Sequence, residues 1–172
     1  IPMFPFSVFS NFSILIINQT NENCWLISEF PKVRVINSYE IGLSKSRNLG
    51  IKNTIGKIIL IADDDVVFLE NLEQNILKAY NENQNVTAIC FQTITKEGYL
   101  YSKYPKIKKE LSNRKLSKVL SIELTCKVED LKKSNCVFNE FFGLGSKFQD
   151  SETFFFLKSI RHKKLKVIFQ PL

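Results

Sequence analysis

An apolar run that ends in three carboxylates is the most distinctive pattern in this chain. Ile58 to Ala62 are five consecutive apolar residues, three of them β-branched, which is typical of a short buried strand in a parallel sheet. Asp63, Asp64 and Asp65 follow at once, where such a strand must leave its sheet. We therefore expect a strand over 58–62 that leads into an acidic turn.

Other apolar runs predict further strands, and apolar residues spaced three and four apart predict helices. The expected strands are Phe12–Ile17, Val33–Ile36, Val86–Thr93, Ser121–Cys126 and Lys166–Phe169, with shorter candidates at Tyr99–Tyr101 and Cys136–Phe138. The expected helices are Glu22–Glu29, Ser44–Asn53 with Ser44 as N-cap, Leu69–Tyr80, Asp130–Lys133 and Asp150–His162. Strands and helices alternate through the first half, which indicates an α/β domain with a mostly parallel sheet flanked by helices.

Length and composition agree with one globular domain. The chain has 172 residues, of which 44% are hydrophobic and 24% charged, enough for one sizeable core but not for two. It begins at Ile1 rather than Met, and its last predicted strand stops just short of Leu172. We therefore expect a single domain over 1–172 that is truncated at the N-terminus, and the late strand raises the same question at the C-terminus.

The net charge of +7 is concentrated in a lysine-rich stretch. Residues 103–118 hold seven lysines and arginines against one glutamate, and their weak periodicity predicts a mobile loop. Such a stretch suits an anionic partner, a phospholipid surface or a lipid-linked phosphate; a solvated helix face is the competing interpretation. No nucleic-acid-binding motif is present, so we expect no nucleic-acid partner.

Cysteine usage and hydropathy bear on the compartment. Cys24, Cys90, Cys126 and Cys136 lie far apart without a CxxC pair, and the chain has one histidine, which argues against a zinc site and favours a reducing compartment. The apolar opening is interrupted by prolines and polar residues, so it resembles neither a signal peptide nor a membrane span. We expect a cytoplasmic protein, with peripheral contact at the inner membrane face through 103–118.

The acidic turn suits a hard cation. Carboxylates about 6 Å apart repel each other by roughly 2–3 kcal/mol per pair at an effective dielectric near 20. A bound cation relieves that repulsion, and Mg²⁺ or Mn²⁺ prefers oxygen ligands. A solvated turn that precedes the next helix is the alternative for Asp63 to Asp65.

Three further polar groups are expected near the same edge, because ligands bind beyond the carboxyl ends of parallel strands. Asn18 and Gln19 follow the first predicted strand and can bind a base or sugar edge. Arg47 lies near the start of a helix and can hold a phosphate by charge-assisted hydrogen bonds. Asp150 and Glu152 open the last helix, where a carboxylate can act as general base. The competing interpretations are a plain loop, a surface arginine and an N-capping carboxylate.

Together these segments resemble family 2 glycosyltransferases with the GT-A fold. Ser44–Ile51 (SKSRNLGI) and Gly56–Asp65 (GKIILIADDD) match the family's "aRNxG" helix, glycine, strand and DXD-type acidic motif. Phe138–Gly145 (FNEFFGLG) and Asp150–Leu157 (DSETFFFL) match its acceptor segment, "F-x-E-x-F-G" followed by "G-E-D-T-x-F-L". The resemblance spans about residues 12–169.

The resemblance implies a Rossmann-like GT-A fold and transfer of a sugar from a nucleotide-diphosphate sugar, with a UDP-sugar as the first expectation. The acceptor would be a hydroxyl of a glycan or a lipid-linked molecule. The reaction would be a direct displacement, usually inverting. The usual setting of such enzymes is assembly of cell-surface polysaccharide or lipopolysaccharide.

The resemblance also implies roles in donor binding. Asp63 and Asp65 would be the DXD pair that binds Mn²⁺ or Mg²⁺, with Asp65 as the direct ligand. Asp64 would lie towards the ribose or the donor sugar. Arg47 would contact the nucleotide.

The remaining implied roles concern binding of the nucleobase and transfer of the proton. Asn18 or Gln19 stands where the family has acidic residues that bind the nucleobase. Glu152 aligns with the catalytic aspartate of the "ED" pair and Ser151 with the preceding glutamate. Because the motif here is Asp-Ser-Glu, Asp150 stays open as the alternative general base.

Two departures keep other functions open. The family's first strand and its nucleotide loop have no counterpart in the chain, and the "GED" motif is altered. The second hypothesis is therefore a catalytically inactive GT-A-like fragment that binds a glycan or a protein partner. A third, a nucleotidyltransferase, predicts a glycine- and lysine-rich phosphate loop near the first strand, which the sequence does not show.

Overall fold

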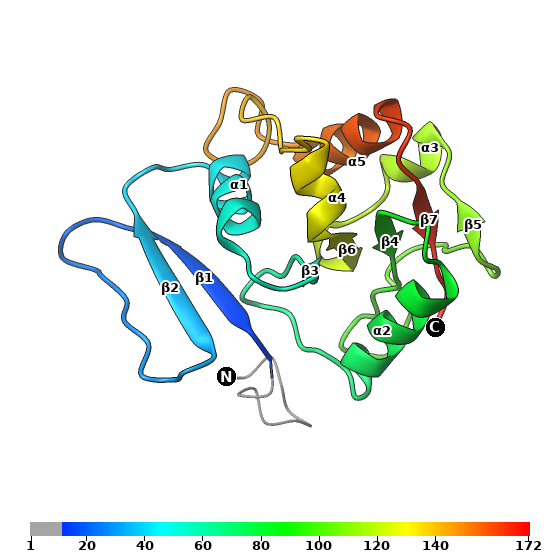
Figure 1. Ribbon diagram of the computed structural model, residues 1–172, viewed down its shortest axis with the longest axis horizontal. Coiled ribbons are helices and arrows are strands. Elements are labelled where there is room, and N and C mark those ends of the chain that lie inside the picture. The colour runs from blue at the N-terminus through cyan, green and yellow to red at the C-terminus, as the bar shows by residue number, and fades with distance from the viewer. Residues whose placement is uncertain (1–11) are drawn as a thin grey trace.

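Residues 12–172 are described by the structure, a computed structural model, and they contain two β-sheets (Figure 1). In the smaller sheet β1 (Ile14–Gln19) pairs with β2 (Val33–Ser38). The five-stranded sheet has the order β3 (Ile58–Leu60), β6 (Leu124–Lys127), β4 (Ala88–Cys90), β7 (Val167–Phe169) and β5 (Lys109–Glu110). Within the described residues, β1 and β3 are therefore both edge strands.

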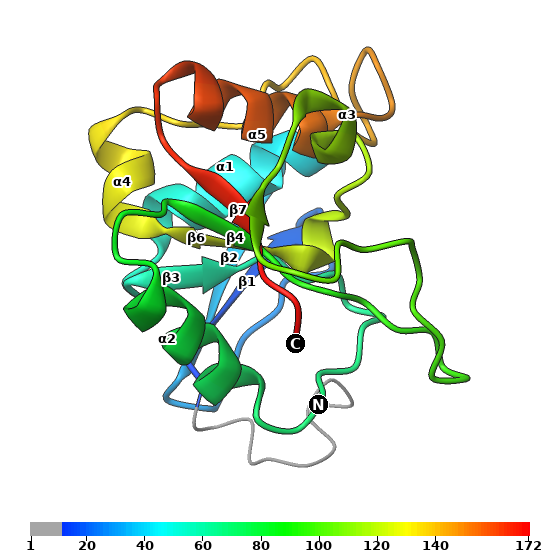
Figure 2. The same ribbon diagram turned by 90° about the vertical axis from the view of Figure 1, so that its right-hand side faces the viewer.

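Helices cover both faces of the larger sheet (Figure 2). They are α1 (Leu43–Asn53), α2 (Leu72–Glu82), α3 (Asn113–Leu116), the 3₁₀ helix η2 (Ser121–Glu123), α4 (Val128–Lys133) and α5 (Glu152–His162). Helices α1, α4 and α5 lie on one face, and α2 lies on the other.

The strands supply a core to each face because successive side chains of a strand point in opposite directions. In β4, Ala88 and Cys90 pack into the cluster that contains Leu131 of α4 and Phe156 of α5. Ile89 between them packs instead into the cluster formed with α2. Both cores depend on the same short strands, so the helices that carry functional side chains are held against one rigid layer.

The predicted α/β class is confirmed, but the five-stranded sheet is mixed rather than mostly parallel. Only β1–β2 and β4–β7 pair in parallel, whereas β3–β6, β4–β6 and β5–β7 are antiparallel. The cause is the path of the chain after β4. The chain enters β6 beside the same end of β4 at which it left the sheet, so Cys90 at the end of β4 pairs with Leu124 at the start of β6.

Most predicted elements are present with shifted ends. The strand expected over 58–62 is shorter, antiparallel to β6 and only half-buried, because β3 lies at an edge. The first strand runs through Gln19 instead of ending at Ile17. Ser44 is not the N-cap of α1, since the helix already starts after Gly42.

Three expected elements are wrong. No helix forms over 22–29, because the Asn37 side chain binds both backbone groups of Leu26, accepting from its N–H and donating to its carbonyl, so that these groups are not free for helical hydrogen bonds. The segments 99–101 and 136–138 are not strands; the first makes a single bridge, between Ile94 and Leu100. Apart from these three elements, the stretch 103–118, which was predicted to be a mobile loop, contains β5 and α3 and buries Leu116 completely.

No helix within residues 12–172 combines the length and the hydropathy needed to cross a bilayer.

Candidate active site

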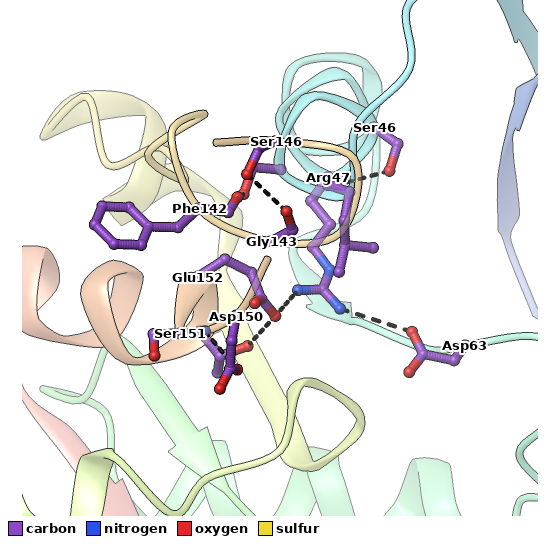
Figure 3. Close-up of polar contacts among 12 residues, drawn as sticks. Ser46, Arg47, Asp63, Phe142, Gly143, Ser146, Asp150, Ser151 and Glu152 are labelled. Atoms are coloured by element: carbon purple, nitrogen blue, oxygen red, sulfur yellow. Dashed lines mark hydrogen bonds and ion pairs between the residues drawn. The ribbon is translucent and has the colours of Figure 1, made fainter. Parts of the chain in front are cut away.

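Three predicted site residues meet although they lie far apart in the sequence (Figure 3). Arg47 comes from α1, Asp63 follows β3, and Glu152 is the first residue of α5. Nη1 of Arg47 lies 2.6 Å from Oε1 of Glu152, and Nη2 lies 3.7 Å from Oδ1 of Asp63. The Arg47 and Glu152 side chains are only 8% and 13% exposed, so this ion pair is shielded from water and from screening by salt.

The start of α1 is bonded to the loop that precedes α5. The first N–H groups of a helix have no partner within the helix, and here Leu43 donates its N–H to the carbonyl of Leu144. The Ser44 hydroxyl donates to the carbonyl of Phe142 at 2.7 Å. Because Arg47 lies one turn further along α1, these contacts bring its side chain towards the start of α5.

Glu152 is held in its ionised form. Burial is the largest single influence and acts to raise its pKa, but the hydrogen bonds from Arg47, the backbone and Thr153 and the charge of Arg47 together outweigh burial, so the pKa is lowered overall. Thr153 donates a second hydrogen bond to the same Oε1 atom at 3.0 Å. A carboxylate at the N-terminus of a helix is further stabilised by the helix dipole. At neutral pH Glu152 is therefore an anion, ready to accept a proton.

The acidic turn concentrates negative charge around Asp63, which Arg47 offsets only in part. The pKa of Asp63 is raised by burial first and then by the neighbouring charges of Asp65, Glu152 and Asp64, while Arg47 acts in the opposite direction. All three aspartates of the turn are exposed. Within the described part of the chain, no three acidic, histidine or cysteine side chains are arranged to hold a metal ion. The turn is thus not a complete metal cage, although an added cation would lower the free energy of its charges.

Asn18 and Gln19 are not in contact with this ion pair. The Asn18 amide donates to Oδ1 of Asn37 and to the carbonyl of Cys24. The Gln19 amide donates to the carbonyls of Glu40 and Gly42, so it ties the end of β1 to the residue before α1. In this structure both amides hold loops at the ends of β1 and β2. Their binding of a nucleobase stays a prediction.

Asp150 differs from Glu152 in its surroundings. Its carboxylate is exposed and accepts the N–H of Ser151 at 2.5 Å. Ser151, which the motif resemblance aligns with a glutamate, is the N-cap of α5, with a left-handed φ of 69°. Of the two candidate bases, only Glu152 is paired with Arg47.

The sequence did not indicate roles for Asn48 and Phe138. The Asn48 carboxamide binds both backbone groups of Phe138, accepting from its N–H at 2.7 Å and donating to its carbonyl at 2.9 Å. The only available signal was the position of Asn48 directly after Arg47 in the matched motif.

Replacement of Gly143 with Ala is expected to disturb Glu152. Gly143 has a left-handed φ of 97°, and a Cβ there would lie 3.3 Å from Cγ of Glu152 and 3.3 Å from Oγ of Ser44. We expect the free energy of unfolding to fall by about 1–3 kcal/mol from backbone strain, and to fall further because the new Cβ displaces Glu152 from Arg47. Urea denaturation measures the loss. Gly98→Ala is the control, since Gly98 also has a positive φ, of 86°, but its Cβ would meet nothing within 4 Å. An equal loss in both variants would show that the contact with Glu152 does not matter.

The sequence matches the profile of the family described as Glycosyl transferase family 2 over residues 11–138. This match covers about three quarters of the chain and includes Arg47 and the acidic turn. The chain belongs to glycosyl transferase family 2. The resemblance inferred from the motifs is thereby confirmed. The matched region ends at Phe138, so Asp150 and Glu152 lie beyond it.

Relatives of this glycosyltransferase family member are distant in sequence. It is 25% identical over 113 residues to an uncharacterized glycosyltransferase of Haemophilus influenzae, which covers 62% of this chain and 38% of that protein. The crystal structure of S. aureus TarS 1–349 has a TM-score of 0.67 at 13% identity, covering 96% of this chain and 53% of that one. The same protein in complex with UDP-GlcNAc has a TM-score of 0.69 at 12% identity, covering 97% and 51%.

These structures establish the fold, and the predicted GT-A fold is confirmed. The chain spans about half of the solved TarS chain and 38% of the Haemophilus influenzae relative.

Proposed function

We propose that this protein transfers a sugar from a nucleoside-diphosphate sugar, a UDP-sugar in the first instance, to an acceptor hydroxyl. The observation that carries the proposal is the buried Arg47–Glu152 pair beside the acidic turn. Such a site combines a candidate proton acceptor with a cluster of carboxylates able to take part in metal binding. Membership of the glycosyltransferase family and the UDP-GlcNAc complex of the similarly folded TarS support this choice of donor.

Glu152 is the proposed general base. Its carboxylate takes the proton from the acceptor hydroxyl while that oxygen attacks the anomeric carbon. The new C–O bond forms as the bond from the anomeric carbon to the diphosphate breaks, and the electron pair leaves with the diphosphate. A single displacement of this kind inverts the anomeric centre. Arg47 keeps Glu152 ionised and fixed in direction, which is what a base needs before the acceptor arrives.

The acidic turn is the proposed site for Mn²⁺ or Mg²⁺. Asp65 and Asp63 would hold the ion, and Asp64 would face the ribose or the donor sugar. The residues fit such an ion because burial, and after it the negative charges of Asp65, Glu152 and Asp64, raise the pKa of Asp63. In addition, Mg²⁺ commonly takes one or two protein carboxylates and completes its shell with substrate phosphates and water. When bound, the ion would act as a Lewis acid towards the departing diphosphate.

The proposed acceptor is a glycan or a lipid-linked molecule in cell-surface polysaccharide or lipopolysaccharide assembly. Lys103, Lys106, Lys108 and Lys109 lie within 103–118, and Lys103 and Lys106 line a surface depression of about 780 Å³ together with Tyr101 and Tyr104. Lysines beside aromatic side chains suit an anionic amphipathic partner. We propose on this basis that the protein works at the cytoplasmic face of a membrane.

Replacement of Asp65 with Asn is expected to abolish the metal-dependent part of nucleotide binding. Titration calorimetry with UDP, in the presence and absence of Mn²⁺, measures this effect directly. Glu70→Gln is the matched control, because it removes one exposed carboxylate just after the same turn. If UDP binding and its dependence on Mn²⁺ survive in Asp65→Asn, the proposed metal site is wrong.

A binding module without catalysis is the second candidate. It is favoured by one observation: the Arg47 guanidinium is engaged by Glu152 and Asp63, rather than directed only at a nucleotide. Wild-type protein that binds UDP-GlcNAc with Mn²⁺ but neither hydrolyses nor transfers the sugar would support this function over the enzyme.

A further inference from the structure

Asn48 binds α1 to a segment distant in sequence through a pair of hydrogen bonds that backbone groups normally make with each other. Its carboxamide meets both the N–H and the carbonyl of Phe138, at 2.7 and 2.9 Å, as a neighbouring strand would. The same amide nitrogen lies 3.1 Å from Oε1 of Glu140. Phe138 is 1% exposed, so its backbone groups would lack partners without Asn48, and an unpaired buried polar group is costly.

The Phe138 ring contacts Arg47 and also the helix that carries Glu152. It stacks on Phe156 of α5, with ring centroids 4.0 Å apart and planes within 6°. Phe156 lies one helical turn after Glu152, on the same face of α5. Cζ of Arg47 lies 5.4 Å from the centroid of the Phe138 ring. One side chain therefore supports the guanidinium directly and supports the helix that carries the carboxylate.

We infer that Asn48 is a positioning residue for proton transfer, because it holds Phe138 in place between α1 and α5. The contacts of Phe138 with Asn48 and Phe156 are called the joint below. The joint sets the distance and direction of Glu152 relative to Arg47 and so to the incoming hydroxyl. This inference rests on the proposed function, in which Glu152 is the base. A shift of about 1 Å in a reacting group can lower a rate by about 100-fold, so loosening the joint would affect the chemical step more than donor binding.

The test compares Asn48→Ala with a matched change in the same helix. Asn53 is also in α1, and its amide donates to the carbonyl of Leu49 within the helix, so Asn53→Ala removes a comparable side-chain hydrogen bond away from the joint. The probe is hydrolysis of UDP-GlcNAc with Mn²⁺. We expect kcat to fall at least 10-fold in Asn48→Ala with KM within about twofold, and both constants to stay within about twofold in Asn53→Ala.

A second variant and a second measurement guard against misfolding. Phe138→Leu keeps an apolar side chain but removes the ring contacts, and we expect the same loss of kcat at nearly constant KM. Hydrogen exchange of residues 139–151 is expected to accelerate in Asn48→Ala but not in Asn53→Ala.

The outcomes separate the inference from the function. An unchanged kcat in Asn48→Ala, or an equal loss in Asn53→Ala, overturns the positioning role. If the wild-type protein neither binds nor hydrolyses UDP-GlcNAc, the proposed function fails, and hydrogen exchange alone tests whether the joint exists. Equal hydrogen exchange of 139–151 in wild type and Asn48→Ala refutes the joint.

Discussion

Replacement of Glu152 with Gln is expected to lower the rate of sugar transfer by about 10²–10⁴-fold, the usual contribution of a general base. Gln keeps the size of the side chain and a carbonyl oxygen that can accept the hydrogen bond from Arg47, but it cannot take a proton. Donor binding should therefore stay within a few-fold of wild type. Turnover of UDP-GlcNAc, together with calorimetric titration of UDP, separates the two effects.

Asp150→Asn is the control for this prediction, because it removes the other candidate base two residues away. Asp150 is exposed and is not paired with Arg47, so its replacement should leave turnover within about twofold. If Asp150→Asn loses activity and Glu152→Gln retains it, the proton acceptor is Asp150. If both variants retain full activity, neither carboxylate is the base.

Much of the architecture could be predicted because it depends on local patterns. The spacing of apolar residues placed α2 and α5 within a few residues of their observed ends. The direction of β6 could not be predicted in this way. It depends on the path of the roughly thirty residues between β4 and β6, which bring the start of β6 beside the end of β4. The false helix over 22–29 has a similar cause, because the Asn37 side chain that binds Leu26 lies outside the segment.

The site shows the same division between local and distant information. The motifs identified Arg47, Asp63 and Glu152 one by one, and the structure brings these three together. The partner of Arg47 was not predicted, because Glu152 lies 105 residues further along the chain. Asn48 was within the matched motif, but its role depends on Phe138, 90 residues away.

Arg47 is the only basic group in the contacts that join this acidic cluster in the described structure, and its position explains how the carboxylates can lie so close together. It contacts one acid from each half of the site, Asp63 from the acidic turn and Glu152 from α5. Without it, burial and the negative charges of the neighbouring carboxylates, which already raise the pKa of Asp63, would act on that group unopposed. The arginine therefore supports the fold and the ionisation of the base at the same time.

Replacement of Arg47 with Met is accordingly expected to destabilise the protein and to make its stability depend on pH in a new way. Removing one partner of a buried ion pair leaves an uncompensated charge, at a cost of about 3 kcal/mol near pH 7. In the wild type, the lowered pKa of Glu152 adds stability above the unfolded-state pKa, and this is lost as the pH falls through the folded-state pKa.

In Arg47→Met the sign is reversed. Burial, the largest influence on Glu152, then acts without the hydrogen bond from Arg47, so the folded-state pKa rises above the unfolded value. The carboxylate then destabilises the fold as the pH increases through that raised pKa. The difference in unfolding free energy between wild type and Arg47→Met should therefore grow from about pH 4 to pH 7, as measured by urea denaturation.

Arg47→Lys separates charge from geometry in the same experiment. Lysine keeps the positive charge but lacks the planar guanidinium that contacts two carboxylates at once. Arg47→Lys should therefore recover most of the wild-type pH dependence of stability but only part of the wild-type turnover. A difference between wild type and Arg47→Met that is the same at pH 4 and pH 7 would mean that the loss comes from packing against Phe138. In that case the ion pair would not be what keeps Glu152 ionised, and the carboxylate would owe its charge to the hydrogen bond from Thr153 and to the helix N-terminus.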